Sequence, residues 1–439
     1  MELISGNWQL MKELYRFNEF YKFTDNQILS ILEQECKFFE SILDEVKPTF
    51  IIAERPVYHH SHLFSEICKV RNIKTIFIVQ SRLAYKSILS SDPIQLDSIQ
   101  DFHNVESKNR NFEELLDFLK SSNVSNQLKT FKKNFTTSRI KKIKAAKEFL
   151  LFSKNENIES HYPYFGRTKL QVLKHEFLSS LKKKNRSKFI DKNLSLQIPN
   201  NEKFIYFPLG MDEERNLLIG APFFTNQIET IRHIAKSLPI NYKLYVKEHY
   251  TLSIRDWRKT SDYAEIMEIP NVTLFHPSVS NDNLLKKCSL VITVGGTSGF
   301  EAVFYQKPSI IFTNTNYSIL PSIYKVDSVH ELSSKIKQSL STKIESSTLD
   351  KFLQILEKDS ISHDLNAHNG KDVALSYQLE AYDESYYKYA ALSGAAYFTC
   401  HTLVRLDSDD YVSMCELTAN YITRSEEVVG DSEVFSLAS

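Results

Sequence analysis

The chain has 439 residues, of which 42% are hydrophobic and 25% charged, and its 54 Lys and Arg residues balance 54 Asp and Glu residues. This composition is typical of a soluble globular protein with two or three domains. It gives no indication of a nucleic-acid partner, and we expect none. Five scattered cysteines form no CxxC or zinc-binding pattern, which favours a reduced compartment. With no apolar run of membrane-spanning length and no signal-peptide layout, the sequence predicts a cytoplasmic location.

The first 199 residues predict an N-terminal Rossmann-like domain. Residues 1–47 have helical periodicity, and they precede a strand at 49–54 (TFIIAE), a helix at 60–71 and a strand at 74–79 (KTIFIV). Strand, helix and strand in this order form a βαβ unit with a parallel sheet. Because open sheets of this kind usually begin with a strand, the domain is either incomplete at its start or elaborated by helices.

Polar residues follow the first predicted strand, where ligands bind in open α/β sheets. Three of them are candidates for contact with an acceptor across a cleft between domains: Arg55, His59 and His60. A metal site is the alternative for the histidines. Since no acidic or cysteine partner stands at a recognisable spacing, we expect no metal here.

Two segments are strongly basic. Residues 129–147 contain eight basic and no acidic residues, and 182–188 (KKKNRSK) add five more basic residues. They are either solvated helix faces or contacts with an anionic membrane surface or an anionic glycan. The second alternative makes the protein peripheral to the inner membrane face. Residues 185–202 are polar and predict a linker between domains.

The region 200–345 predicts a second Rossmann-like domain, because strands and helices alternate throughout it. The expected strands are 204–208, 243–247, 272–275, 290–294 and 309–313, and the expected helices are 225–238, 282–287 and 298–306. Two such domains face to face are the arrangement of many nucleotide-sugar glycosyltransferases. The predicted fold class is therefore α/β with two Rossmann-like domains, GT-B-like, and a C-terminal appendage at 346–439.

A glycine-rich turn follows the strand at 290–294. Gly295, Gly296 and Gly299 surround Thr297 and Ser298, and a helix is expected to begin there. Such a turn directs N–H groups and the positive end of the helix dipole at one point, which favours a phosphate. The alternative is a turn that only joins the strand to the helix.

Four segments in order resemble one family: YFPLGMDEER (206–215), residues 223–250, VTLFHPSVSNDNLL (272–285) and VITVGGTSGFEAVFYQKPSII (291–311). This series is similar to the capsular polysaccharide and surface carbohydrate biosynthesis family, which includes bacterial Kdo transferases. The resemblance covers residues 200–345. It implies a GT-B fold, a metal-independent reaction without a cofactor, and a donor nucleotide on the C-terminal domain.

The resemblance also implies site residues. The donor phosphate is expected at Gly295, Gly296, Thr297, Ser298 and Gly299, with the ribose hydroxyls on Glu301 and with Lys247 as a further donor ligand. Lys247 and His249 would neutralise phosphate charge as the glycosidic bond breaks. Glu248 and His249 are placed at the reacting centre, with Glu213 as an acceptor base or donor ligand. Tyr250 stands where the family has proline. The alternatives are a helix-dipole role for Glu301 and a solvated acidic turn around Glu213.

The tail has its own motif. TLVRLDSDDYVS (402–413) is similar to the Asp-x-Asp strand end of GT-A glycosyltransferases, where carboxylates hold a metal. No nucleotide-binding βαβ unit precedes it, so an acidic turn is the favoured interpretation of Asp407, Asp409 and Asp410. A helix near 348–357 is expected to cross back to the first domain.

The sequence therefore predicts transfer of a sugar from a nucleotide-activated donor, CMP-Kdo or a related ulosonate, to a capsular or surface glycan or a glycolipid. Two alternatives remain: a sugar-nucleotide epimerase of similar fold, and a non-catalytic glycan-binding subunit of a capsule assembly complex.

Overall fold

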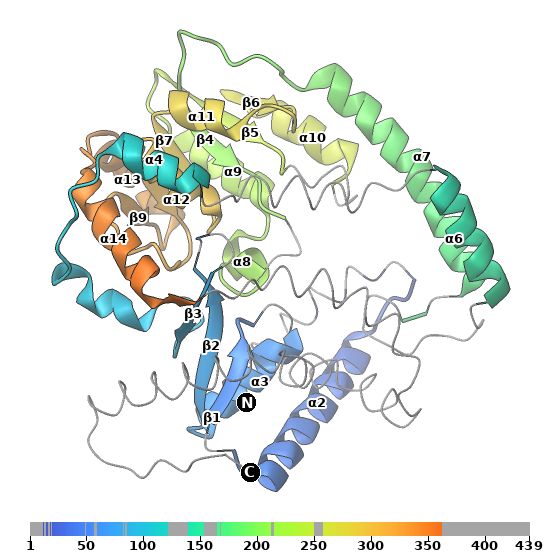
Figure 1. Cartoon of the computed structure of the whole chain (residues 1–439). Coiled ribbons are helices and arrows are strands. Elements are labelled where there is room, and N and C mark those ends of the chain that lie inside the picture. Colours follow the sequence, from blue (N-terminus) through green and yellow to red (C-terminus); the bar gives the residue numbers. More distant parts are fainter. Residues whose placement is uncertain are drawn as a thin grey trace.

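The structure is a computed structural model of the whole chain. It describes residues 12, 15, 18, 20–48, 50–56, 59–81, 83, 86–121, 139–152, 165–166, 168–211, 215–249 and 258–361. Within these residues the strands form two sheets, one of four strands and one of six, and Figure 1 shows the helices around them. The predicted α/β architecture with two sheets is confirmed.

The smaller sheet has the strand order β1-β2-β3-β10. β1 (Phe50–Glu54) and β2 (Lys74–Gln80) are parallel, as predicted. β3 (Ser87–Ser90) and β10 (Ser360–Ile361), which were not predicted, pair in antiparallel fashion. The sheet is therefore mixed, because β3 runs antiparallel to β2, and β10 from the far end of the described chain forms its edge.

Two helices pack against β1. α2 (Asp25–Val46) begins at a capping box in which Thr24 and Gln27 bond each other's backbone amides, and α3 (His59–Val70) follows β1. Leu32, Phe39 and Leu63 lie in the core that the two helices share. The remaining elements before the larger sheet are η1 (Asp97–His103), α4 (Phe112–Ser121), α6 (Arg139–Phe152) and α7 (Lys169–Asn193).

The larger sheet has the order β6-β5-β4-β7-β8-β9, and every pairing in it is parallel. Its strands are β4 (Lys203–Pro208), β5 (Tyr242–Lys247), β6 (Val272–Phe275), β7 (Leu290–Thr293), β8 (Ser309–Ile311) and β9 (Ile323–Lys325). In chain order this is 3-2-1-4-5-6, the doubly wound Rossmann topology. Apolar runs such as FIYF in β4 are buried on both faces, as parallel strands require.

Helices cover both faces of the larger sheet. The core on one face contains residues of α9 (Gln227–Ser237), α10 (Thr260–Met267) and α13 (Leu332–Leu340). The core on the other contains residues of α11 (Asn281–Lys287) and α12 (Thr297–Phe304). Three short elements complete this part: α8 (Arg215–Leu218), η3 (Pro222–Phe224) and η5 (Val329–Glu331).

One apolar core joins the two sheets. It contains Phe77 and Ile88 from the smaller sheet, Phe300 from α12, and Phe352 from α14 (Ser346–Asp359). After α14 the chain enters β10 of the smaller sheet, so the predicted return to the first domain is confirmed.

The expected linker at 185–202 is wrong in its first half. α7 continues to Asn193, because Arg186 and Ile190 are buried and Ile190 packs in the core of the larger sheet. Polar composition suggested a linker here, but burial of Ile190 and Arg186, with Phe189 packed against the same core, holds this helix against the second domain.

Candidate functional site

The candidate site lies at the carboxyl edge of the larger sheet, where the strand order reverses between β4 and β7. Open α/β sheets bind ligands in the crevice at this point. Tyr206 of β4 is level with Tyr245 of β5 and Val291 of β7. β4 and β5 remain paired up to Pro208 and Lys247, and β7 lies on the other side of β4, so the loops after these three strands leave the sheet at the same edge.

The glycine-rich turn joins β7 directly to α12. Gly296 is the residue before the helix, and no side chain among the described residues caps the helix there. The Gly296 amide donates to Thr293 Oγ1 at 3.1 Å, and the Tyr317 hydroxyl donates to the Gly296 carbonyl at 2.5 Å. The turn is thereby fixed from both sides. The first N–H groups of a helix have no intrahelical acceptor, so those of Thr297 and Ser298 are available to an anion.

The glycines of this turn have different functions. A Cβ on Gly296 would lie 2.9 Å from Thr293 Oγ1, the atom that accepts its amide hydrogen bond. A Cβ on Gly299 would lie 3.0 Å from the Tyr317 hydroxyl and 3.1 Å from Thr293 Cγ2. Gly299 thus allows α12 to pack closely, and a bulky residue at Gly296 would distort the turn. Substituting either glycine would not isolate an effect on ligand binding.

Lys247 ends β5 with its side chain buried beside α11. Its Nζ donates to Asn281 Oδ1 at 2.6 Å, and the Tyr206 hydroxyl donates to the same oxygen at 3.0 Å. Burial lowers the pKa of Lys247 to about 8, and the nearby carboxylate of Glu301 opposes this shift. Lys247 and Glu301, both predicted donor ligands, are therefore close enough for their charges to interact. A cation held by a neutral amide can still neutralise an approaching phosphate.

Glu248 points to the opposite face of the sheet from Lys247 and is buried. Arg258 Nη1 donates to both of its carboxylate oxygens at 2.6 Å, and the Tyr263 hydroxyl donates to Oε2 at 3.0 Å. The amide of His249 donates to Oε1 at 2.8 Å. Arg258 Nη2 also donates to the Gly210 carbonyl at 2.9 Å. Glu248 thus ties the end of β5 to the loop after β4, which favours a positioning role over proton transfer.

The loop after β4 is fixed on both of its described sides. The Gln227 side chain bonds both the amide and the carbonyl of Gly210, at 2.7 and 3.0 Å. Thr313, which follows β8, donates to the Gly220 carbonyl at 2.6 Å. Glu213 lies outside the described residues, as does Tyr250. The described residues nearest this gap in the loop are thus anchored at Gly210 by α9 and at Gly220 by the residue that follows β8.

The acceptor-side candidates of the first domain lie at the start of α3 and after β1. His59 and His60 are buried, and His59 Nε2 lies 3.1 Å from Glu35 Oε1 of α2. Arg55 is half-buried, and its amide donates to the Ile78 carbonyl at 3.3 Å. The burial of both histidines favours a role in holding α2 on α3. Arg55 Nε is buried, and the acceptor contact of Arg55 stays a prediction.

The sequence predicted no metal-binding site in the protein. The described residues contain no group of three or more His, Cys, Asp and Glu side chains arranged to hold a metal ion. Asp407, Asp409 and Asp410 lie outside those residues. His276 lies in the loop after β6, where its Nδ1 is 2.6 Å from Ser278 Oγ.

Several residues of the site were missed from the sequence: Tyr206, Asn281, Arg258 and Tyr263. One signal was present, because Ser280 caps α11 and predicts that Asn281 stands at a helix start beside the sheet edge. No local sequence pattern predicts that Arg258 belongs to the site. It lies 10 residues beyond Glu248, and only the fold brings them together.

Comparison with known proteins gives one family match. The model of the family described as capsule polysaccharide biosynthesis protein matches residues 104–338. No protein with curated function matches the sequence. Among solved structures, the chain is similar to the beta Kdo 2,7 transferase KpsC of Thermosulfurimonas dismutans, with 11% identity and a TM-score of 0.34, over 76% of this chain and 88% of that one.

Two further solved structures show weaker similarity. The UDP-GlcNAc 2-epimerase of Methanocaldococcus jannaschii has 11% identity and a TM-score of 0.28, over 77% of this chain and 83% of its own. The spinosyn rhamnosyltransferase SpnG has 12% identity and a TM-score of 0.25, over 37% and 44%. These structural scores are low, so the family match alone carries the assignment.

Proposed function

The chain belongs to the capsule polysaccharide biosynthesis protein family, and from this premise we propose that it is a glycosyltransferase. It moves a sugar from a nucleotide-activated donor to a capsular or surface polysaccharide or its glycolipid precursor. The resemblance of residues 200–345 to bacterial Kdo transferases favours CMP-Kdo or a related CMP-ulosonate as the donor. The nucleotide binds to the larger sheet and leaves as the free nucleotide.

The observation that carries this proposal is the start of α12 at the point where the strand order reverses. The helix begins without a side-chain cap among the described residues, so its first amides have no side-chain acceptor from a capping residue. Lys247 lies on the same face of the sheet as α12 and close enough to Glu301 for their charges to interact. A dipole end and a buried cation at one edge suit the phosphate of a nucleotide.

The same groups have a function in the reaction. As the bond between the anomeric carbon and the phosphate oxygen breaks, negative charge develops on the departing phosphate. The α12 amides and Lys247 stabilise that charge, and His249 assists from the end of β5. The new bond joins the anomeric carbon to an acceptor oxygen, whose proton passes to a carboxylate. Glu213 is the carboxylate we assign to this step, and Glu248 positions the loop that carries it.

Product analysis with and without an acceptor tests this proposal. Purified protein is incubated with CMP-Kdo, or with UDP-sugars, in the presence and absence of capsular oligosaccharide. We expect nucleotide release and an extended oligosaccharide only when the acceptor is present. An epimerised nucleotide sugar formed without acceptor would assign the epimerase activity instead. Glycan binding with no turnover of any donor would assign the non-catalytic role.

We expect the transfer to need no divalent metal, because the assigned phosphate ligands are a lysine, a histidine and backbone amides. Turnover should therefore be unchanged when EDTA is added to the same assay. Loss of turnover in EDTA that manganese restores would contradict this expectation, and it would direct attention to Asp407, Asp409 and Asp410.

A further inference from the structure

Helices α6 and α7 form an exposed pair along one side of the molecule (Figure 1). The Lys169 ammonium donates to the Leu150 carbonyl at 2.9 Å and holds the start of α7 against the end of α6. Near its start, α7 contacts the first domain through the rings of His175 and Phe20, whose centroids lie 5.2 Å apart. Its far end is anchored to the larger sheet, where Asp191 pairs with His276 at 3.1 Å.

Between these anchors, α7 exposes an apolar stripe. Leu170, Phe177 and Leu181 are 81%, 66% and 47% exposed. The spacings of seven and four residues place all three on one face of the helix. That face is opposite to the one that buries Arg186 and Ile190. Large apolar side chains in this number on one helix face are costly in water and indicate a contact surface.

Lysines continue the same face. Lys174 lies between Leu170 and Phe177, while Lys184 and Lys188 extend the face beyond Leu181, and all three are exposed. The six residues follow spacings of four, three, four, three and four, so they form one row along the helix. Apolar and basic side chains are therefore mixed along one face of α7, with the apolar ones toward its start and most of the lysines toward its end.

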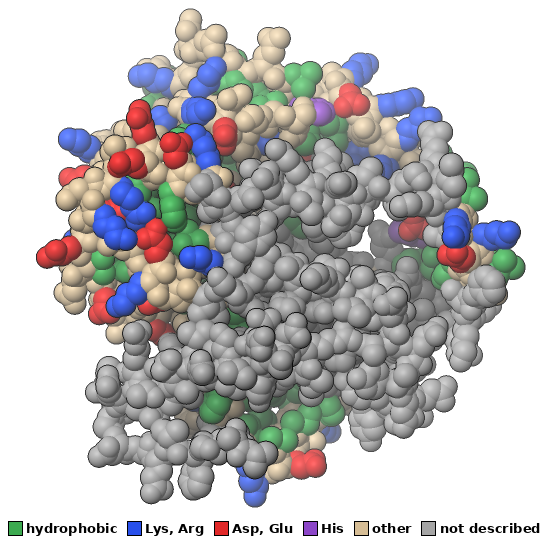
Figure 2. Space-filling model, in the orientation of Figure 1, with side chains coloured by type: hydrophobic (Ala, Val, Ile, Leu, Met, Phe, Trp, Pro, Cys, Tyr) green, Lys and Arg blue, Asp and Glu red, His purple; other side chains and the backbone are tan. Residues whose placement is uncertain are grey.

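α6 repeats the pattern. Ile143 and Leu150 are 70% and 47% exposed, and exposed Lys147 stands between them at the spacing of one face. Together α6 and α7 contain thirteen basic and three acidic residues, a net charge of +10 in a chain whose overall formal charge is zero. Figure 2 shows blue and green side chains along the rim where Figure 1 places the two helices.

We propose that the exposed face of α6 and α7 binds the surface of a bilayer that contains anionic lipids. On a membrane surface, exposed apolar side chains can enter the boundary between headgroups and acyl chains, and neighbouring lysines can contact anionic headgroups. An anionic glycan would account for the lysines but not for three exposed apolar residues in one row. No helix of the described residues can itself cross a bilayer, so the contact is peripheral.

Vesicle sedimentation tests the proposal on the full-length protein. The probes are vesicles of phosphatidylcholine alone and vesicles with 30% phosphatidylglycerol. Two double variants test the two kinds of side chain separately. Phe177→Ser with Leu181→Ser removes apolar side chains, and Lys184→Gln with Lys188→Gln removes positive charges. Matched controls are Ile240→Ser, whose side chain is fully exposed elsewhere, and Lys337→Gln with Lys343→Gln on the second domain.

We expect binding to the anionic vesicles only. The serine variant should bind at least tenfold more weakly, because apolar area no longer enters the boundary. The glutamine variant should bind on the order of 30-fold more weakly, because each headgroup-facing lysine contributes roughly a factor of five. The control variants should bind like the natural protein. Thermal unfolding of every variant verifies the fold, since exposed substitutions change stability little.

Two outcomes would overturn the proposal. One is the absence of binding to anionic vesicles. The other is binding that the serine variant retains fully, that only the glutamine variant loses, and that soluble heparin abolishes. This second outcome would assign the surface to an anionic glycan. Neither outcome depends on which sugar the protein transfers, so both are distinguishable from a failure of the proposed function.

Discussion

At the scale of single residues, Lys247 and Glu248 are adjacent in sequence and both buried, but their charges have different partners. Lys247 is buried with a neutral amide oxygen as the acceptor of its hydrogen bond, whereas Glu248 is buried in a bidentate pair with Arg258. A charge that the protein does not fully compensate is typical of a functional site. A charge that the protein compensates with three donors is typical of a scaffold. The two residues therefore call for different experiments.

We expect nucleotide affinity to depend on the charge of Lys247. Its pKa is lowered to about 8 by burial, so the protonated form that attracts a phosphate is lost as pH rises through that value. The dissociation constant of CMP should then increase by up to tenfold per pH unit above about 8, as measured by calorimetry. A Lys247→Met variant should bind weakly and lack this pH dependence. An unchanged pH profile in that variant would contradict the assignment.

The same substitution should stabilise the free protein. The folded pKa of Lys247 lies below its unfolded value, so the unfolded chain binds more protons between about pH 8 and 10.5 and stability rises with pH through that window. Below it the buried ammonium is a net cost. Denaturant unfolding at pH 7 should therefore show Lys247→Met to be more stable, on the order of 1–3 kcal/mol. A less stable variant would mean that the charge is fully compensated.

Glu248 and His249 should differ in how their loss appears. Glu248→Gln breaks a buried ion pair and should lower the free energy of unfolding by about 3–5 kcal/mol. His249→Ala should lower turnover on the order of 10²-fold if the imidazole stabilises developing charge, with little change in stability. Denaturant titration and steady-state kinetics on both variants give the comparison. A stable Glu248→Gln variant without activity would return Glu248 to the reacting centre.

At the scale of elements, the start of α12 is the feature on which the site depends. Periodicity located β7 and α12 to within one or two residues, because a buried strand and a buried helix have unmistakable apolar patterns. The turn between them was located by its glycines. What the pattern did not reveal is how Tyr317, from the loop after β8, fixes the Gly296 carbonyl. Such a contact joins segments 21 residues apart and has no local signature.

The substitution Thr297→Asp tests whether the donor phosphate binds at the start of α12. Thr297 is exposed at the first helical position. A carboxylate there favours the helix dipole by about 0.3–1 kcal/mol and should leave the fold intact or slightly more stable. It should also repel a bound phosphate, so CMP affinity should fall at least tenfold, while the neutral control Thr297→Asn binds normally. Unchanged affinity in the aspartate variant would place the phosphate elsewhere.

At the scale of the whole molecule, the two sheets are joined by shared apolar packing. Most strands of the larger sheet were predictable, because each is a contiguous apolar run between turn residues. The smaller sheet was half predictable: β3 and β10 are short, and their pairing joins residues more than 270 positions apart. The acceptor-side histidines were predicted from their place after a strand, but burial beside Glu35 depends on how α2 packs, which no local pattern records.

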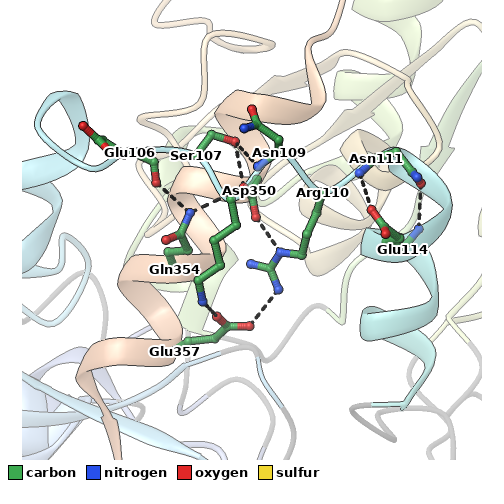
Figure 3. Close-up of polar contacts among 10 residues, drawn as sticks. Glu106, Ser107, Asn109, Arg110, Asn111, Glu114, Asp350, Gln354 and Glu357 are labelled. Atoms are coloured by element: carbon green, nitrogen blue, oxygen red, sulfur yellow. Dashed lines mark hydrogen bonds and ion pairs between the residues drawn. The ribbon is translucent and has the colours of Figure 1, made fainter.

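A polar network at the edge of that shared packing fixes the crossing helix (Figure 3). Arg110 Nε donates to Asp350 Oδ1 at 2.5 Å, and its Nη1 donates to Glu357 Oε1 at 2.9 Å. The Ser107 hydroxyl donates to Asp350 Oδ2 at 2.7 Å. Burial raises the pKa of Asp350, but the hydrogen bonds from Ser107 and Arg110 outweigh it, so the pKa lies below its ordinary value. The carboxylate thus remains charged although its side chain is fully buried.

Replacing Arg110 should therefore lower the stability of the whole protein. Arg110→Met leaves the Asp350 carboxylate buried without its ion pair and should lower the free energy of unfolding by about 3–5 kcal/mol at pH 7. Lys108→Met is the matched control, because Lys108 reaches Glu357 at 3.4 Å from an exposed position, and such pairs contribute about 0–1 kcal/mol. Denaturant unfolding of both variants gives the comparison, and equal losses would contradict a special role for the buried pair.

Acid titration measures the stabilising contribution of the Asp350 charge in a second way. Because the folded pKa of Asp350 is depressed, its contribution to stability is complete above the ordinary Asp pKa and is lost as pH falls toward the folded value. The natural protein should lose stability below about pH 4 more steeply than Arg110→Met, in which the depression of the pKa is reduced. Since the core around Phe352 includes residues of both sheets, this acid loss should appear as one transition in tryptophan fluorescence and circular dichroism alike. Parallel acid curves for the two proteins would show that the Asp350 charge does not hold the crossing helix.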